Sequence, residues 1–160
     1  MNTDAVTDDQ FKQAMAQFPS GVTIVTTVAN DEQFGFTASA FSSLSLSPPL
    51  ILVCLANNAD CFKPFNAGEQ FAVNIIDAKH EKLAMKFATK GCDKFSGGEF
   101  VLGSSGLPIL SGTPVALECR TKYTYPGGDH IILVGQVEYL TINDGTPTIW
   151  YAGGFQHLGT

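Results

Sequence analysis

The chain has 160 residues, of which 44% are hydrophobic and only 15% are charged. This length suits one domain with a single core, and so little charge excludes a disordered chain. The net charge is −6 and the nine Lys and Arg residues are spread thinly, so we expect no nucleic-acid partner, because no basic stripe is present to bind a phosphate backbone. We therefore expect one domain over residues 1–160, with a loose segment over residues 1–9.

The start of the chain and its cysteines indicate a cytoplasmic protein. The first eleven residues, MNTDAVTDDQF, are acidic and lack the apolar segment of a signal peptide. No apolar run is long enough to span a bilayer, so we expect no membrane partner. The spacing of the four cysteines favours buried, reduced thiols over a zinc site or a disulfide framework, and we expect no metal. They are Cys54, Cys61, Cys92 and Cys119.

The first predicted element is a helix. Thr7 and Gln10 have the spacing of a capping box, in which each side chain bonds the backbone of the other residue. Phe11, Met15 and Phe18 then fall on one helical face, and a Pro-Ser-Gly sequence ends the helix. We expect this apolar face to pack on the core of the domain.

Strands dominate the rest of the first half. The segments GVTIVTTVA and QFGFTASAF are rich in β-branched and aromatic residues and flank NDE, which predicts a hairpin. The uniformly apolar segment 50–56, LILVCLA, predicts a strand buried on both faces, and 70–76 predicts another strand. A short helix ended by Gly68 is expected between them. A second helix is expected over 79–89, with His80 exposed to solvent.

The second half contains long strands joined by turns. We expect a short strand and a Gly-Ser-Ser-Gly loop over 100–110, then strands over 115–125, 130–142 and 148–151. A parallel α/β fold would need strands and helices to alternate throughout, and they do not. The pattern predicts a mainly β protein, a closed or half-closed barrel with a few peripheral helices.

A serine-rich segment, GFTASAFSSLSLSPPLILVCL, separates two of the predicted strands. Its hydroxyl residues are Thr37, Ser39, Ser42, Ser43, Ser45 and Ser47. On composition it is either a surface linker or a binding loop, because small hydroxyls and free amides beside apolar side chains suit a flat heteroaromatic ring with a phosphate tail. Both interpretations stay open at this point.

A second unusual segment is YPGGDHIILVGQVEYL. Gly127 and Gly128 can form the turn, which leaves Asp129 and His130 at the start of a strand. A histidine at a strand edge is either structural or directed at a ligand.

Together these segments resemble the short-chain flavin reductase family. FPSGVTIVTT, the serine-rich segment, FAVNII, KFA and GGDHIILVGQVE occur in the family's order and cover nearly the whole chain. The family consists of NAD(P)H:flavin oxidoreductases that commonly serve as the reductase component of two-component flavin-dependent monooxygenases. The resemblance implies an FMN-binding split β-barrel, a homodimer with flavin near the subunit interface, and FMN or FAD as cofactor. NADH or NADPH is the implied co-substrate, and a partner oxygenase is the implied receiver of diffusible reduced flavin.

The resemblance also implies site residues. Along the isoalloxazine ring it places Thr37, Ala38, Ser39 and Ala40. Ser42 and Ser43 would reach the ribityl chain or the phosphate, and Pro48 would fix the loop. His130 would position the nicotinamide, with Asp129 fixing its tautomer. The C-terminal segment would contribute Tyr151 and Phe155 as ring contacts, with ordinary packing as the alternative.

One departure from the family concerns the phosphate. Relatives often carry Ser, Thr or Lys in the segment that here reads ANNADCF. Asn58 can still donate a hydrogen bond, but Asp60 would repel a phosphate if it pointed inward. The replacement candidates are Lys63, Lys86 and Lys90. A flavin-binding protein without enzymatic activity is the alternative to a reductase.

Overall fold

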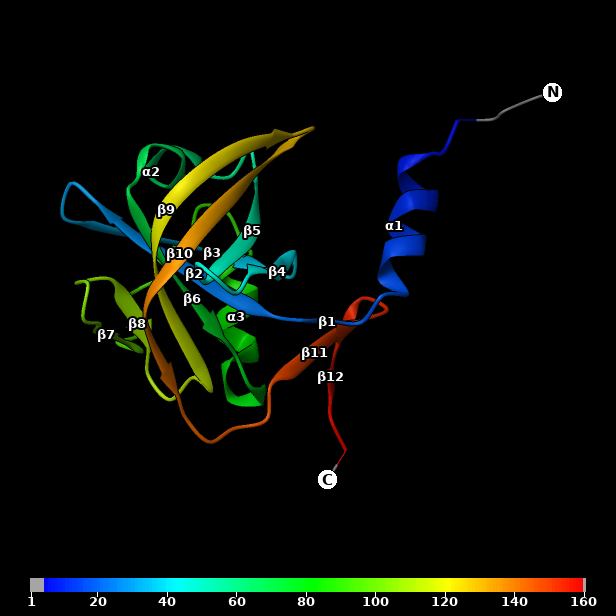
Figure 1. The fold of residues 1–160 in the computed structure, drawn as a ribbon. Helices are drawn as coiled ribbons and strands as arrows, with labels where there is room; N and C mark the ends of the chain where they lie inside the picture. The colour runs from blue at the N-terminus through cyan, green and yellow to red at the C-terminus, as the bar shows by residue number, and fades with distance from the viewer. Residues whose placement is uncertain (1–4, 160) are drawn as a thin grey trace.

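Over the described residues the strands form three antiparallel sheets, with short helices at the periphery (Figure 1). The computed structural model describes residues 5–159. The strands are β1 (Ser20–Gly21), β2 (Thr23–Ala29), β3 (Glu32–Ala38), β4 (Phe41–Ser45), β5 (Leu50–Ala56), β6 (Gln70–Ile75), β7 (Phe100–Leu102), β8 (Pro108–Leu110), β9 (Val115–Gly127), β10 (His130–Ile142), β11 (Thr148–Tyr151) and β12 (Gly154–His157). The helices are α1 (Asp8–Ala16), α2 (Phe62–Ala67), the 3-10 turn η1 (Ala78–His80) and α3 (Glu81–Phe87).

The main sheet has seven strands in the order β3-β2-β6-β9-β10-β5-β4. Laid flat, it would hold its two edge strands about 29 Å apart, because neighbouring strands are spaced by about 4.8 Å. Only Ser39 and Ala40 separate β3 from β4 along the chain, and so short a link spans about 10 Å. The sheet must therefore curl until its edges approach each other. The expected mainly β split barrel is confirmed, and its edges meet without closing into a continuous barrel.

The core lies inside the curl of this sheet. Every second residue of β5 is buried, and these residues pack against the inward side chains of β2, β6 and β10. The remaining β5 residues are only half-buried, so the prediction of a strand buried on both faces is wrong. The physical reason is that β5 has a free outer face on this chain. The members of the main core cluster include Val25, Val53, Leu55, Phe71, Val73 and Leu133.

The hairpin predicted around NDE is confirmed, as β2 paired with β3. Its two turn residues, Asn30 and Asp31, have φ values of 51° and 63°. Such a turn matches the right-handed twist of the two strands, and Asn and Asp tolerate positive φ better than most residues.

The serine-rich segment lacks the regular side-chain alternation of a strand, yet part of it forms the edge strand β4, with a register shift after Ser43.

Helix α1 contradicts the prediction that its apolar face packs on the core. The capping box of Thr7 and Gln10 is present. However, α1 has no buried residue, and Phe11, Met15 and Phe18 are 58%, 54% and 75% exposed. Figure 1 shows the helix standing away from the barrel, beside the tip of the β11–β12 hairpin. The amphipathic pattern is correct, but no residue among 5–159 buries the apolar face.

His80 is buried and not exposed to solvent as predicted. Its Nδ1 lies 3.0 Å from Oδ1 of Asp77, and its Nε2 lies 3.1 Å from the carbonyl oxygen of Ser111. The tight η1 turn directs the ring inward, which the helical pattern alone does not reveal.

The burial of the cysteines also differs from the prediction: Cys92 is exposed, in contrast to the predicted buried thiols.

The ends of the chain complete the description. No helix within residues 5–159 is both long enough and apolar enough to cross a membrane. The segment 1–9 expected to be loose lies partly outside the described residues, while Asp8 and Asp9 form the first turn of α1. The expectation of a single domain over residues 1–160 stays a prediction.

Candidate functional site

Three hollows open next to one another where β3 passes into β4. The α1 hollow, of 610 Å³, lies between α1 and the strands β4 and β5. The His130 hollow, of 230 Å³, lies between the end of β5 and residues 87–94. The hairpin hollow, of 210 Å³, lies between α3 and the β11–β12 hairpin. Cys54 borders the first two, Thr37 the last two, and Ser39 the first and third, so the three hollows adjoin one another, and we refer to them together as the groove.

Part of the serine-rich segment lines the α1 hollow. Ser39, Ala40 and Ser42 line it together with Leu52 and Cys54 of β5. The carbonyl of Ala40 accepts a hydrogen bond from the amide of Cys54 at 3.0 Å, which ties the link to β5. Because β3 and β4 are the edge strands of the sheet, each has one side with backbone groups that no neighbouring strand pairs. The groove therefore offers backbone donors and acceptors beside an apolar wall.

Four of the predicted flavin contacts do not line these hollows within the described part of the chain: Ala38, Ser43 and Pro48, and also Tyr151, which is described with the hairpin hollow. Ala38 is only 6% exposed and its methyl group packs in the core. Ser43 points to the sheet face opposite Ser42, since successive residues of a strand alternate, and its carbonyl accepts a bond from the Ser42 hydroxyl at 2.8 Å. Pro48 lies in the exposed turn between β4 and β5. These residues can shape the groove through the backbone only.

The His130 hollow brings together the two motifs that the sequence singled out. His130 begins β10 and lines this hollow with Thr37 and Asn58. The register explains the proximity, because His130 lies opposite Ala56 at the end of β5. The amide of Asn57 also donates to the Asp129 carbonyl at 2.9 Å and anchors the turn. Residues more than seventy positions apart thus border one space.

The imidazole of His130 is held in place by its neighbour. Its Nδ1 lies 2.7 Å from Oδ1 of Asp129, and 45% of the His130 side chain is exposed. The hydrogen bond from His130, together with its charge, lowers the pKa of Asp129. An ionised carboxylate can only accept, so Nδ1 is the donor in this pair. The opposite ring nitrogen, Nε2, is left to bind a ligand.

Basic side chains also line the His130 hollow. Lys90 donates to the carbonyl of Asn58 at 2.8 Å, and Lys94 donates to the carbonyl of Gly35 at 3.1 Å. Asp60 accepts a bond from the amide of Gly91 at 3.0 Å, which engages one carboxylate oxygen. The hollow therefore holds two ammonium groups and one carboxylate.

The other lysine candidates lie elsewhere. Lys86 donates to the hydroxyl of Ser96 at 3.2 Å, and Lys63 is an exposed residue of α2. Sequence reasoning missed Lys94, which reaches the hollow only because residues 88–94 fold back over the end of β3.

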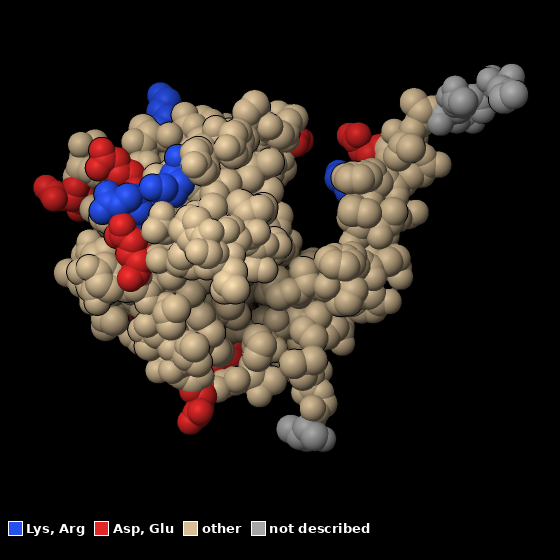
Figure 2. Space-filling model, in the orientation of Figure 1, with Lys and Arg blue, Asp and Glu red and all other residues tan. Residues whose placement is uncertain are grey.

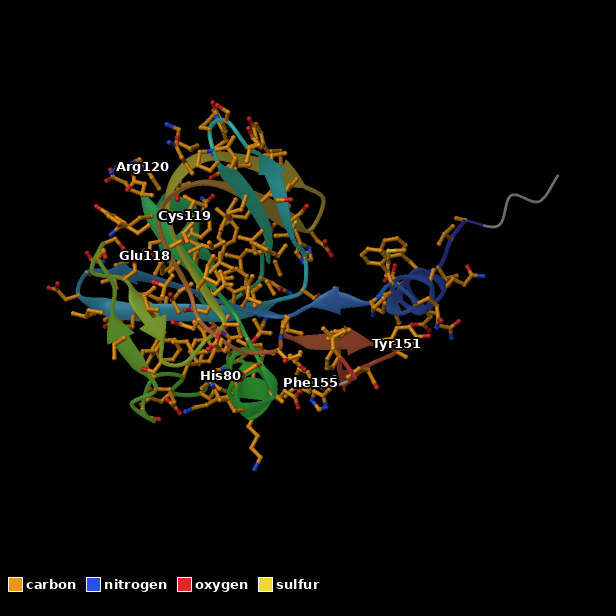
Figure 3. All side chains as sticks on the ribbon, turned by 60° about the horizontal axis from the view of Figure 1, so that its bottom comes forward. His80, Glu118, Cys119, Arg120, Tyr151 and Phe155 are labelled. Carbon is orange, nitrogen blue, oxygen red and sulfur yellow. The ribbon has the colours of Figure 1, made fainter. Side chains whose placement is uncertain are left out.

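The hairpin hollow has an aromatic wall. Phe155 and Trp150 contact each other edge to face, with ring centroids 5.0 Å apart, and both line the hollow. Tyr151 lies farther out, at the end of β11 near α1, whereas Phe155 lies close to the barrel (Figure 3). The Tyr151 hydroxyl donates to Gln17 at 3.4 Å. Sequence reasoning missed Trp150, although its position within TIWY was the available signal.

Thr37 has a structural role that its motif did not indicate. Its hydroxyl donates to the carbonyl of Ala84 in α3. This bond holds β3 to the helix that forms the opposite side of the hairpin hollow. The side chain is thereby occupied, and Thr37 offers the groove its backbone and methyl group.

Comparison with known proteins agrees with this geometry. Residues 15–159 match the family described as flavin reductase like domain. The chain is 43% identical over 158 residues to the actinorhodin polyketide dimerase of Streptomyces coelicolor, covering 96% of this chain and 88% of that protein. It is 32% identical over 148 residues to the flavin-dependent monooxygenase reductase subunit HsaB of Mycobacterium tuberculosis, covering 91% and 79%. The chain belongs to the flavin reductase-like family.

A solved structure shares the fold over nearly the full length. The NADH:FAD oxidoreductase SgcE6 of Streptomyces globisporus, in complex with NAD and FAD fragments, superposes with a TM-score of 0.90 at 34% identity. The superposition covers 98% of each chain. The fold is thus the split-barrel type of the flavin reductases.

Proposed function

We propose that the chain is an NAD(P)H:flavin oxidoreductase that reduces FMN or FAD at the expense of NADH or NADPH. The observation that carries the proposal is the position of His130, whose imidazole is fixed by Asp129 and lines the same hollow as Thr37 and Asn58. A protein that only stores flavin has no need for such a group at the mouth of the groove. The relatives named as reductases support the same activity.

The residues of the groove have the chemical groups that binding of a flavin requires. Backbone amides along the β3–β4 link suit the polar edge of the ring, and Trp150 and Phe155 suit its apolar end. The ammonium groups of Lys90 and Lys94 suit a phosphate, which Asn58 can bind through its amide. These two lysines take the place of the Ser, Thr or Lys expected in the segment 56–62.

The chain's contribution to the reaction is to position two flat rings. A bound flavin supplies the acceptor for the hydride of the nicotinamide. This transfer needs no general base, so contact distance and orientation between the rings decide the rate. His130 adds stacking area and one hydrogen-bonding nitrogen for the carboxamide. Asp129 keeps the ring in the tautomer and rotamer that present this nitrogen to the hollow.

We further propose a homodimer that releases reduced flavin to a partner oxygenase in the cytoplasm. The exposed apolar face of α1 supports a dimer, because a contiguous apolar surface of this kind marks an interaction site. The name of the HsaB relative, a reductase subunit, supports the partner oxygenase. Free thiols at all four cysteines are consistent with a reducing compartment.

The test is oxidation of NADH and of NADPH by the purified protein, with and without added FMN, FAD and riboflavin. The proposal expects turnover that requires added flavin and saturates with its concentration. The relative rates then identify the preferred flavin and nicotinamide. A protein that binds flavin but oxidises neither nicotinamide is a flavin-binding protein, and the reductase proposal fails.

A further inference from the structure

Two of the cysteines border a fourth hollow, of 240 Å³, which adjoins the His130 hollow. Cys61 and Cys92 both line it, and Cys61 borders the His130 hollow as well. The amide of Gly91 donates to Oδ2 of Asp60 at 3.0 Å. This bond joins the two chain segments at the residues directly before Cys61 and Cys92. The fold therefore brings two thiols that are distant in the sequence to one small space.

The two thiols differ in exposure. Cys92 is exposed, whereas Cys61 is buried and belongs to the main core cluster. An oxidant from solution therefore reaches Cys92 first, and Cys61 is left to react with the product. The Cys92 thiol donates to the carbonyls of Lys86 and Thr89 at 3.3 and 3.4 Å. A thiol is a weak donor, so these bonds hold it only weakly.

The segment that carries Cys92, residues 88–94, also supplies charge to the groove. Lys90 and Lys94 line the His130 hollow, and Lys12 is the only other lysine among the described residues that line the groove. Figure 2 shows that charged side chains gather on the side of the barrel away from α1, whereas the side turned toward α1 is mostly uncharged. A displacement of the segment 88–94 would therefore remove most of the positive charge available to a phosphate in the groove.

Few bonds hold this segment in place. Its first two residues, Ala88 and Thr89, still donate to carbonyls of α3. Beyond them, the contacts already described are the bond from the Gly91 amide to Asp60 and the two bonds from lysine side chains to backbone carbonyls. Backbone that is held by a few exposed hydrogen bonds changes position at low cost in free energy.

We propose that Cys61 and Cys92 form a reversible disulfide that weakens the binding of phosphorylated flavin and so lowers the reductase activity. The inference rests on the proposed function, which supplies the oxidant: dioxygen takes two electrons from released reduced flavin and becomes hydrogen peroxide. A reductase that works faster than its partner oxygenase makes this oxidant beside its own thiols. The disulfide draws Cys92 away from the end of α3 and thereby displaces Lys90 and Lys94. In a reducing compartment such a disulfide is transient and responds to the supply of peroxide.

The oxidation takes two steps. The Cys92 thiolate attacks one oxygen of the peroxide, the O–O bond breaks, and a sulfenic acid and a hydroxide ion form; the hydroxide takes up a proton to give water. The Cys61 sulfur then attacks the Cys92 sulfur, the S–O bond breaks, and the hydroxyl group leaves as water with the Cys61 proton. One peroxide is reduced to two waters, and the two thiols are oxidised to one disulfide. Burial raises the pKa of Cys61, and the charge of Lys94 opposes the rise. The second step should therefore accelerate with increasing pH.

Peptide mass spectrometry without reductant tests the disulfide itself. The purified protein is treated with hydrogen peroxide at mildly alkaline pH, alkylated and digested. The proposal expects a linked peptide that joins Cys61 to Cys92 and that dithiothreitol separates. In the Cys61→Ser variant the oxidation should stop at a sulfenic acid of Cys92, which dimedone traps. If Cys92 of the native sequence is oxidised to a sulfinic acid while Cys61 remains a thiol, the proposal is overturned.

Flavin affinity tests the consequence. We expect peroxide treatment followed by desalting to weaken FMN binding about tenfold, as loss of a charged hydrogen bond does. Quenching of Trp150 fluorescence measures the affinity. Cys92→Ser is the matched control, because its hydroxyl can donate to the same two carbonyls but forms no disulfide, and its affinity should not respond to peroxide. An unchanged FMN affinity once the native disulfide has formed overturns the inference. Oxidation of NADH by the untreated protein with added flavin judges the reductase proposal separately.

Discussion

Nε2 of His157 lies 2.6 Å from Oε1 of Glu81, and this contact joins the last strand to the first turn of α3. The hydroxyl of Thr148 donates to the same oxygen, also at 2.6 Å. Glu81 therefore binds both strands of the C-terminal hairpin at its base. Because the hairpin carries Trp150 and Phe155, one carboxylate fixes the aromatic wall of the hairpin hollow relative to α3.

Replacement of Glu81 tests this arrangement. We expect Glu81→Ala to lower the free energy of unfolding by about 1–3 kcal/mol, because it leaves the buried Thr148 hydroxyl without this acceptor. Urea unfolding followed by the fluorescence of Trp150, the single tryptophan of the chain, measures the change. Lys82→Ala alters the neighbouring exposed residue and serves as the control. An equal effect of both substitutions would show that Glu81 has no special role.

Removal of the His130 ring should affect hydride transfer more than flavin binding. We expect His130→Ala to slow reduction in single-turnover mixing on the order of 10²-fold, or to raise KM for the nicotinamide, since loss of positioning has costs of this size. Flavin affinity, measured by quenching of Trp150 fluorescence, should change little. Unchanged single-turnover reduction contradicts the role assigned to His130. A large loss of flavin affinity would instead make it a flavin ligand.

The lysines of the His130 hollow should distinguish phosphorylated from unphosphorylated flavin. We expect Lys90→Ala to weaken FMN binding about tenfold or more, because a hydrogen bond to a charged group contributes about 1.5–3 kcal/mol. Riboflavin lacks the phosphate, so its affinity should stay the same. Lys63→Ala, outside the hollow, is the control for a general loss of positive charge. A parallel loss of riboflavin binding would mean that Lys90 supports the loop and not the phosphate.

The cysteines should react in the order of their exposure and acidity. Burial and the nearby carboxylates of Glu138 and Glu118 raise the pKa of Cys119 to about 12. Burial also raises the pKa of Cys61, despite the opposing charge of Lys94. A raised pKa means less thiolate at any given pH, and the thiolate is the form that reacts. We expect iodoacetamide to label exposed Cys92 first in the native protein, and Cys61 and Cys119 only after unfolding.

Mass spectrometry of peptides across a pH series measures this order. Labelling of Cys54 should increase steeply toward alkaline pH, because burial raises its pKa as well. Early labelling of Cys119 would contradict its burial in the main core cluster, where β9 places it.

Much of the local structure could be predicted from the sequence because it depends on neighbouring residues. The capping box of Thr7 and the turn at Asn30 are decided within four residues, and the apolar, β-branched composition of 50–56 and 70–76 indicates strands. The resemblance to a family then identified the split barrel and the segments that border the groove. Edge strand β4 could not be predicted from the alternation of polar and apolar side chains. Its polar residues pair with β5 through backbone hydrogen bonds, which side-chain alternation does not indicate.

The sequence by itself determined the strands, the helix at the start and the segments that carry the chemistry, since periodicity, caps and turns act over short distances. Only the tertiary structure decided that His130 meets Thr37 and Lys94 in one hollow and that Glu81 holds the last hairpin. It also decided that α1 stands off the barrel with its apolar face exposed. These features depend on how a curled sheet brings distant residues together and on which surfaces one chain leaves uncovered, and no local pattern encodes either.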